Sequence, residues 1–92
     1  MIDFDQIAAE IKNSGDSHVF GIPGGGASLD LVDSVERKDI EFVTTFTEGA
    51  AAIMAGTLGF LDRTTGVAMS IKGPGLANMI PGLSFCFFEN LP

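Results

Sequence analysis

Apolar and polar residues follow one another along this chain with two different spacings, which predict alternating helices and strands. Helical spacing, or a run of small residues, predicts helices over residues 4–13, 28–38, 48–62 and 76–88, the last one interrupted at Pro81 and Gly82. Short apolar runs predict buried strands over residues 18–22, 40–46 and 66–71. The pattern therefore predicts an α/β protein.

A strand, a loop and a helix follow one another three times, and the predicted strands are apolar on both faces. This order favours a parallel sheet covered by helices, in a three-layer αβα arrangement. Ligands of such sheets bind beyond the carboxyl ends of the strands. The most unusual segments of the chain follow those ends: PGGG at 23–26, Thr47-Glu48, and KGPG at 72–75. Because three strands are few for this fold, we expect residues 1–92 to be a single, incomplete domain.

Glu48 is the acidic residue with the most unusual surroundings. It begins a predicted helix that carries no further charge until Asp62 and is rich in glycine and alanine. Glutamate is common in the first turn of a helix, where it offsets the helix dipole. However, glycine inside a helix costs roughly 1 kcal/mol relative to alanine. A helix that carries two glycines in its interior despite this cost is suited to close packing against a backbone, a subunit or a flat ligand. We therefore interpret Glu48 as a candidate catalytic acid.

The composition limits which kinds of binding partner and which cellular compartment we expect for this chain. Twelve acidic against five basic side chains give a net charge of -7, which argues against binding to nucleic acid or to an anionic membrane. The single Cys86 excludes an internal disulfide and favours a reducing, cytoplasmic setting, while the single His18 argues against a zinc site. Neither a signal peptide nor an apolar run of roughly 18 residues is present, so we expect a soluble protein.

Two glycine-rich turns follow predicted strands, but neither carries a complete phosphate-binding motif. GIPGGGAS lacks the Lys-Ser/Thr ending of a P-loop, and its third glycine comes too early for the dinucleotide fingerprint. A tight turn with positive φ explains it equally well. The sequence Gly73-Pro74-Gly75 is likewise explained by a turn with proline at the first helical position. A nucleotide site at the GIPGGG turn is a weaker alternative.

The order of these pieces resembles the pyrimidine-binding domain of thiamine diphosphate-dependent enzymes, the group that contains acetolactate synthase, pyruvate oxidase, benzoylformate decarboxylase and sulfopyruvate decarboxylase. The matching segments are VFGIPGG at 19–25, EGAA at 48–51 with Ala55-Gly56, GPGLAN at 73–78, Gly82-Leu83 and Pro92. The resemblance implies that Glu48 hydrogen-bonds N1′ of the aminopyrimidine ring and favours the tautomer whose 4′-nitrogen removes the thiazolium C2 proton.

The resemblance implies roles for further residues as well. Pro23, Gly24 and Gly25 would line the pyrimidine pocket. Gly73, Pro74 and Gly75 would let the backbone approach the cofactor, and Asn78 would anchor the turn or a subunit contact. No metal-binding residue is implied in this chain, because in the family a separate domain with a Gly-Asp-Gly signature holds the diphosphate and its Mg²⁺.

Several positions depart from the family pattern. Thr47 stands where many relatives have histidine, and it follows Phe46 where a basic residue is frequent. Ile71-Lys72 stands where benzoylformate decarboxylase-like members carry a catalytic histidine, so acid–base chemistry of that type is not implied. Lys72 either meets a substrate carboxylate or is a solvated side chain, and solvation is the ordinary state of a lysine.

The resemblance thus implies the pyrimidine-binding part of a thiamine diphosphate-dependent lyase or transferase that acts on a small 2-oxo acid, in the manner of a decarboxylase or an acetolactate synthase. Such a part is not active alone, so a complementary diphosphate-binding domain or subunit and an oligomeric assembly are expected. The alternative is a non-catalytic α/β module that serves assembly only, with Phe85, Phe87 and Phe88 as an apolar patch.

Overall fold

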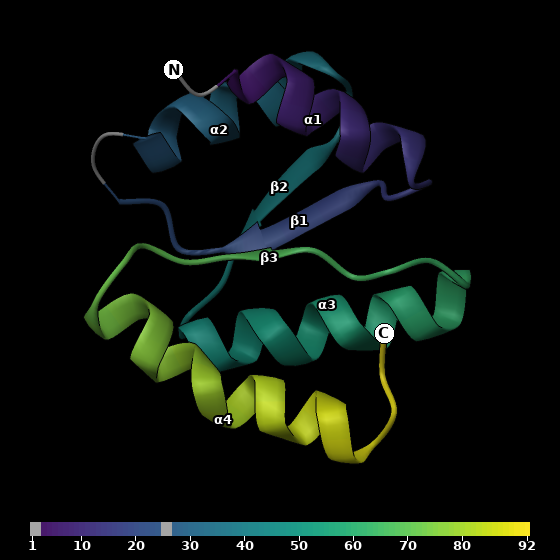
Figure 1. Cartoon of the computed structure of the whole chain (residues 1–92), viewed down its shortest axis with the longest axis vertical. Helices are drawn as coiled ribbons and strands as arrows, with labels where there is room; N and C mark the ends of the chain where they lie inside the picture. Colours follow the sequence, from purple (N-terminus) through teal and green to yellow (C-terminus); the bar gives the residue numbers. More distant parts are fainter. Residues whose placement is uncertain (1–2, 25–26) are drawn as a thin grey trace.

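Parallel strands form the centre of the structure (Figure 1). The structure is a computed structural model, and it describes residues 3–24 and 27–92. The elements in chain order are α1 (Phe4–Asn13), β1 (His18–Gly21), α2 (Ala27–Arg37), β2 (Glu41–Thr44), α3 (Glu48–Asp62), β3 (Ala68–Met69) and α4 (Pro74–Phe88). The limits of α1 and α3 agree with those predicted from the sequence. The other elements differ by a few residues at their ends.

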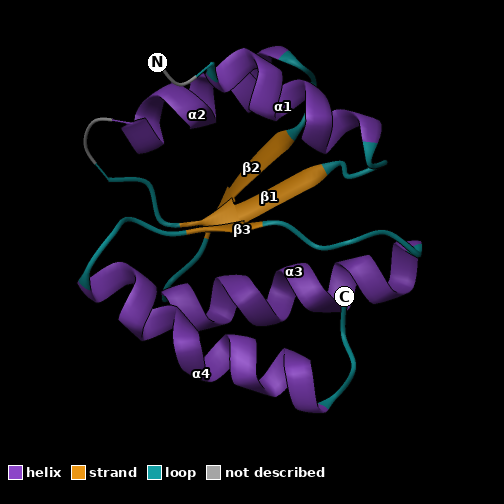
Figure 2. Ribbon diagram, viewed as in Figure 1, coloured by secondary structure: helices purple, strands orange, loops and turns teal. Residues whose placement is uncertain are grey.

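The strands are parallel and lie in the order β2-β1-β3. Phe20 of β1 is paired with Val43 on one side and with Ala68 on the other. Helices α1 and α2 cover one face of the sheet, α3 covers the other, and α4 lies against α3 (Figure 2). The predicted α/β fold, a parallel sheet covered by helices, is confirmed.

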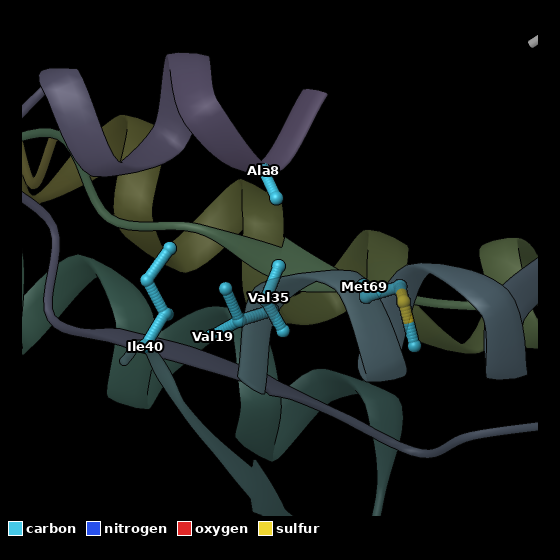
Figure 3. Close-up of a cluster of buried hydrophobic side chains, with 5 residues drawn as sticks. All are labelled: Ala8, Val19, Val35, Ile40 and Met69. Carbon is cyan, nitrogen blue, oxygen red and sulfur yellow. The ribbon is translucent and has the colours of Figure 1, made fainter. Parts of the chain in front are cut away.

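Two separate apolar clusters fill the space between the sheet and its helices. The first lies on the α1 and α2 side and contains Ala8, Val19, Val35, Ile40 and Met69 (Figure 3). The second lies on the α3 side and contains Phe20, Ala51, Ala52, Ala55 and Met79. Successive side chains of a strand point to opposite faces, so neighbouring residues of β1 belong to different clusters.

The end of the chain differs most from the prediction. The third strand contains only Ala68 and Met69, and α4 begins at Pro74 and continues through Pro81 without a break. Proline occupies the first turn of α4, where its missing N–H costs no hydrogen bond. At Pro81 a proline does remove a helical hydrogen bond. Close packing of α4 on α3 keeps the helix continuous there.

Among the described residues, no helix is both long and apolar enough to cross a membrane. The same residues contain no group of three or more His, Cys, Asp or Glu side chains arranged to hold a metal ion.

Candidate functional site

The turns that follow β1 and β3 lie side by side at the carboxyl edge of the sheet. The strand order makes β1 and β3 neighbours, while α2 and α3 lie on opposite faces of the sheet. In parallel sheets of this kind, the ligand crevice forms beyond the carboxyl ends of two such neighbouring strands. Gly24 contacts Ile71 so closely that a β-carbon on residue 24 would overlap Ile71 Cγ2. A β-carbon on residue 75 would lie 2.8 Å from Ile71 Cγ1. Ile71 therefore stands between the two glycine-rich turns.

The Glu48 carboxylate faces the second of these turns. Its Oε2 lies 3.6 Å from the position that a β-carbon on residue 75 would occupy, and Glu48 is half-buried. Within residues 3–24 and 27–92, no hydrogen bond or ion pair holds this carboxylate. The structure thus brings Glu48, Gly75, Ile71 and Gly24 to one edge of the sheet, although they come from three different loops.

The turn before Glu48 is held by threonine side chains. The backbone N–H of Ala50 donates to Thr47 Oγ1 at 3.0 Å, so Thr47 is the N-cap of α3. The Thr45 hydroxyl donates to the Thr47 carbonyl oxygen at 2.8 Å. An N-cap side chain satisfies one of the free N–H groups at a helix start. Because Thr47 performs this task, the Glu48 side chain is not needed as a cap and can face the crevice.

The turn after β1 is held by Ser28 of α2. The backbone N–H of Gly24 donates to Ser28 Oγ at 2.9 Å, and the Ser28 hydroxyl donates to the Gly24 carbonyl oxygen at 2.8 Å. Pro23 and Gly24 are half-buried there. Gly25, which the sequence also predicted to line the pocket, lies outside the described residues.

The remaining predicted site residues lie in the last loop and the start of α4. Gly73 has a φ of 78°, a left-handed conformation that favours glycine, and Gly73 and Pro74 are exposed. Asn78 is exposed, and its carbonyl oxygen faces Gly49 of α3, at 3.5 Å from where a β-carbon on residue 49 would lie. The backbone of Asn78 therefore belongs to the contact between α3 and α4.

A family profile described as "Thiamine pyrophosphate enzyme, N-terminal TPP binding domain" matches residues 4–92. The chain belongs to this family. The match covers nearly the whole chain, and it confirms the resemblance drawn from the glycine-rich turns and Glu48. It also identifies thiamine diphosphate as the cofactor of the family.

The chain is also similar to acetolactate synthases from several organisms. The catabolic acetolactate synthase of Raoultella terrigena is 36% identical over 89 residues, which cover 96% of this chain and 16% of that protein. The acetolactate synthase of Bacillus subtilis (strain 168) is 39% identical over 74 residues, which cover 79% of this chain and 13% of that protein. A probable acetolactate synthase large subunit of Methanocaldococcus jannaschii is 30% identical over 88 residues, 96% of this chain and 15% of that protein. The chain therefore spans less than a fifth of the length of these relatives.

The residues of the crevice fit a thiamine pyrophosphate-binding domain in two respects. A carboxylate with no partner among the described residues has oxygens available to a ring nitrogen or amino group. Gly24 and Gly75 lack β-carbons, so the two turns pack closely around Ile71 beside this carboxylate. Ser28, the N-cap Thr47 and the neighbouring Thr45 complete the support of this edge.

Sequence analysis did not identify Thr45, Ser28 or Ile71 as parts of this edge. Thr47 was recognised only as a departure from the family pattern, although a threonine directly before a helix is an N-cap signal. Ile71 was likewise noted only as standing where some relatives have histidine. Its contacts with Gly24 and Gly75 depend on β1 and β3 being neighbours, which the sequence alone does not reveal.

The other charged contacts lie away from this crevice. Arg37 of α2 is paired with Asp5 of α1 at 2.9 Å and with Asp33 at 3.1 Å. A hydrogen bond from Ser34, together with the charge of Arg37, lowers the pKa of Asp5. These contacts join α1 to α2 and do not bear on the cofactor. Lys72 is exposed and forms no ion pair with any part of the chain that the structure describes.

Proposed function

We propose that this chain holds the aminopyrimidine ring of thiamine diphosphate in an enzyme that acts on a 2-oxo acid, and that Glu48 is the group that activates the ring. The position of the Glu48 carboxylate carries this proposal. It lies at the carboxyl edge of the sheet, beside Gly75, without a partner among the described residues.

Glu48 is suited to hold or share a proton with a ring nitrogen. A carboxyl group can accept a hydrogen bond when ionised and donate one when protonated. The cap formed by Thr47 and the hydrogen bond from Thr45 fix the backbone from which Glu48 projects. Thiamine diphosphate, when bound, supplies the electron sink for a carbanion next to a carbonyl group.

We propose further that a separate domain or subunit binds the diphosphate and its Mg²⁺. Two observations support this. The described residues offer no cluster of metal ligands, and the relatives are several times longer than this chain. The outer face of α4 offers a surface for such a partner, because exposed apolar side chains recur there at helical spacing: Leu76, Ile80, Leu83 and Phe87.

Turnover of a 2-oxo acid by the assembled enzyme tests the role of Glu48. We expect Glu48→Gln to lower kcat by at least about 100-fold, the usual scale of a lost proton-transfer group. Glu41→Gln is the matched control, because Glu41 lies at the start of β2, at the opposite edge of the sheet. Turnover by the Glu48→Gln enzyme at the rate of the control would show that Glu48 is not the activating acid.

A second candidate function is a module that serves assembly only, and the exposed face of α4 favours it. Phe85, Phe87 and Phe88 are all exposed, as the apolar patch of that hypothesis requires. The two functions differ in cofactor binding. Calorimetry with thiamine diphosphate and Mg²⁺ on the assembled protein separates them, because an assembly module would leave the cofactor unbound.

A further inference from the structure

We propose that Ile71 is a positioning residue that sets the width of the pyrimidine crevice, and that its β-branched shape is what the site requires. The proposal deepens the proposed function and rests on it. Ile71 belongs to none of the glycine-rich motifs. It follows β3 and lies between the turns that contain Gly24 and Gly75.

Each γ-carbon of Ile71 contacts a different turn. Cγ2 lies against Gly24, and Cγ1 lies against Gly75. Both glycines lack the side chain that would otherwise fill this space. The pairing of Gly21 with Met69 sets the distance between β1 and β3 where the strands end, and beyond that point the side chain of Ile71 contacts both turns. A side chain with two γ-carbons can touch both turns at once. A β-branched side chain is also stiff at χ1, so it holds both γ-carbons in place.

Each of the two turns also has contacts of its own. Ser28 holds Gly24 from α2, on the far side of the turn. Gly75 is buried at the start of α4, where Pro74 fixes the backbone. Among the described residues, Ile71 contacts both Gly24 and Gly75 and so links the two turns.

The link matters for function because the same turn faces Glu48. The position of a β-carbon on residue 75 lies 2.8 Å from Ile71 Cγ1 and 3.6 Å from Glu48 Oε2. A shift of this turn changes the space beside the carboxylate. Ile71 itself is 42% exposed, so it also presents apolar surface at this edge. A flat heteroaromatic ring with a polar edge and an apolar face fits such surroundings.

The test uses the pyrimidine half of the cofactor, 4-amino-5-hydroxymethyl-2-methylpyrimidine, which needs no diphosphate site. The ¹⁵N-labelled chain is titrated with this probe, and the dissociation constant is read from the amide signals of Gly24, Glu48 and Gly75. Four variants are compared with the wild-type chain: Ile71→Val, Ile71→Leu, Ile71→Ala and, as an exposed apolar control on the last turn of α3, Leu61→Ala. Thermal unfolding of each variant is measured in parallel.

We expect Ile71→Val to bind as the wild type does, because valine keeps both γ-carbons. Ile71→Leu conserves volume but has a single γ-carbon, so we expect it to bind about fivefold more weakly and Ile71→Ala about tenfold more weakly. In these two variants the amide signals of Gly24 and Gly75 should move even without the probe. Leu61→Ala should change neither the affinity nor those signals.

Equal affinity of the valine, leucine and alanine variants would overturn the inference, even if all of them were less stable than the wild type. The proposed function would survive that result, provided that the wild-type chain binds the probe and Glu48→Gln binds it more weakly. A wild-type chain whose amide signals do not respond to the probe would instead contradict a pyrimidine site formed by this chain alone, and the role of Ile71 with it.

Discussion

Gly82 lies against the carbonyl oxygen of Gly49, so that α3 and α4 cross with no side chain between their backbones. A β-carbon on residue 82 would overlap that oxygen and lie 3.0 Å from Ala52 Cβ. The sequence predicted that the small residues of α3 allow a close approach. The structure shows that α4 of the same chain makes this approach, at the residue next to Glu48.

We expect Gly82→Ala to lower the free energy of unfolding by about 1–3 kcal/mol, because the added methyl group forces the two helices apart. Gly49→Ala is the matched control. A β-carbon there would lie 3.5 Å from the Asn78 carbonyl oxygen and 3.8 Å from the Gly82 nitrogen, which is ordinary contact. Urea unfolding of both variants measures the difference. Similar losses in the two variants would contradict the close crossing at Gly82.

We expect Thr47→Ala to lower the free energy of unfolding by about 1 kcal/mol, because it removes the N-cap of α3. Thr47→Ser keeps the hydroxyl oxygen and should keep most of the stability. Thr57→Ala, on an exposed position of the same helix, should change stability by less than about 0.5 kcal/mol. Thermal or urea unfolding measures all three. If the serine variant loses as much as the alanine variant, the hydroxyl does not act as the cap.

Asp5 should stabilise the folded chain at neutral pH and lose this effect in acid. The hydrogen bond from Ser34 and the charge of Arg37 lower its pKa below the ordinary value of 3.8. The folded state therefore binds this proton less readily than the unfolded state, so the stabilisation is present above about pH 4 and disappears as the pH falls through the folded pKa. Asp5→Asn should be less stable than the wild type at pH 7 and equally stable near pH 2. An equal difference at both pH values would exclude the electrostatic explanation.

Asp16 should show the opposite dependence on pH. It is only 7% exposed, and burial raises its pKa above 3.8, while a hydrogen bond from Thr64 partly opposes the shift. The folded state holds this proton more tightly than the unfolded state does. The contribution of Asp16 to stability therefore falls as the pH rises from 3.8, the ordinary pKa, through the higher pKa of the folded state. We expect Asp16→Asn, relative to the wild type, to gain stability between pH 3 and pH 7. Urea unfolding at the two pH values tests the sign, and a relative loss would contradict it.

Much of the architecture could be predicted from the sequence, because local patterns determine it. The amphipathic α1 and the small-residue α3 were located to the residue. The unbroken α4 was not predicted, since Pro81 disfavours a helix locally, whereas in the structure Gly82 and Cys86 on the same helix pack against α3. Here tertiary contacts outweigh local propensity.

The candidate site was predictable only where a residue stood out by itself. Glu48 did, as a charge at the junction of an apolar strand and an apolar helix. Ile71 did not, because an isoleucine after a strand is ordinary until the strand order places it between Gly24 and Gly75. Contacts between distant segments carry this information, and a single sequence does not display them.

The division of the core into two clusters has a consequence for how the chain opens. Val19 and Phe20 are adjacent in β1, yet each belongs to a different cluster. We expect that either layer of helices can detach and expose its own cluster while β1 stays paired with β2 and β3 and covered by the other layer. The amide hydrogens of β1 should therefore exchange with solvent only when both layers are lost, and they should be the most slowly exchanging in the protein.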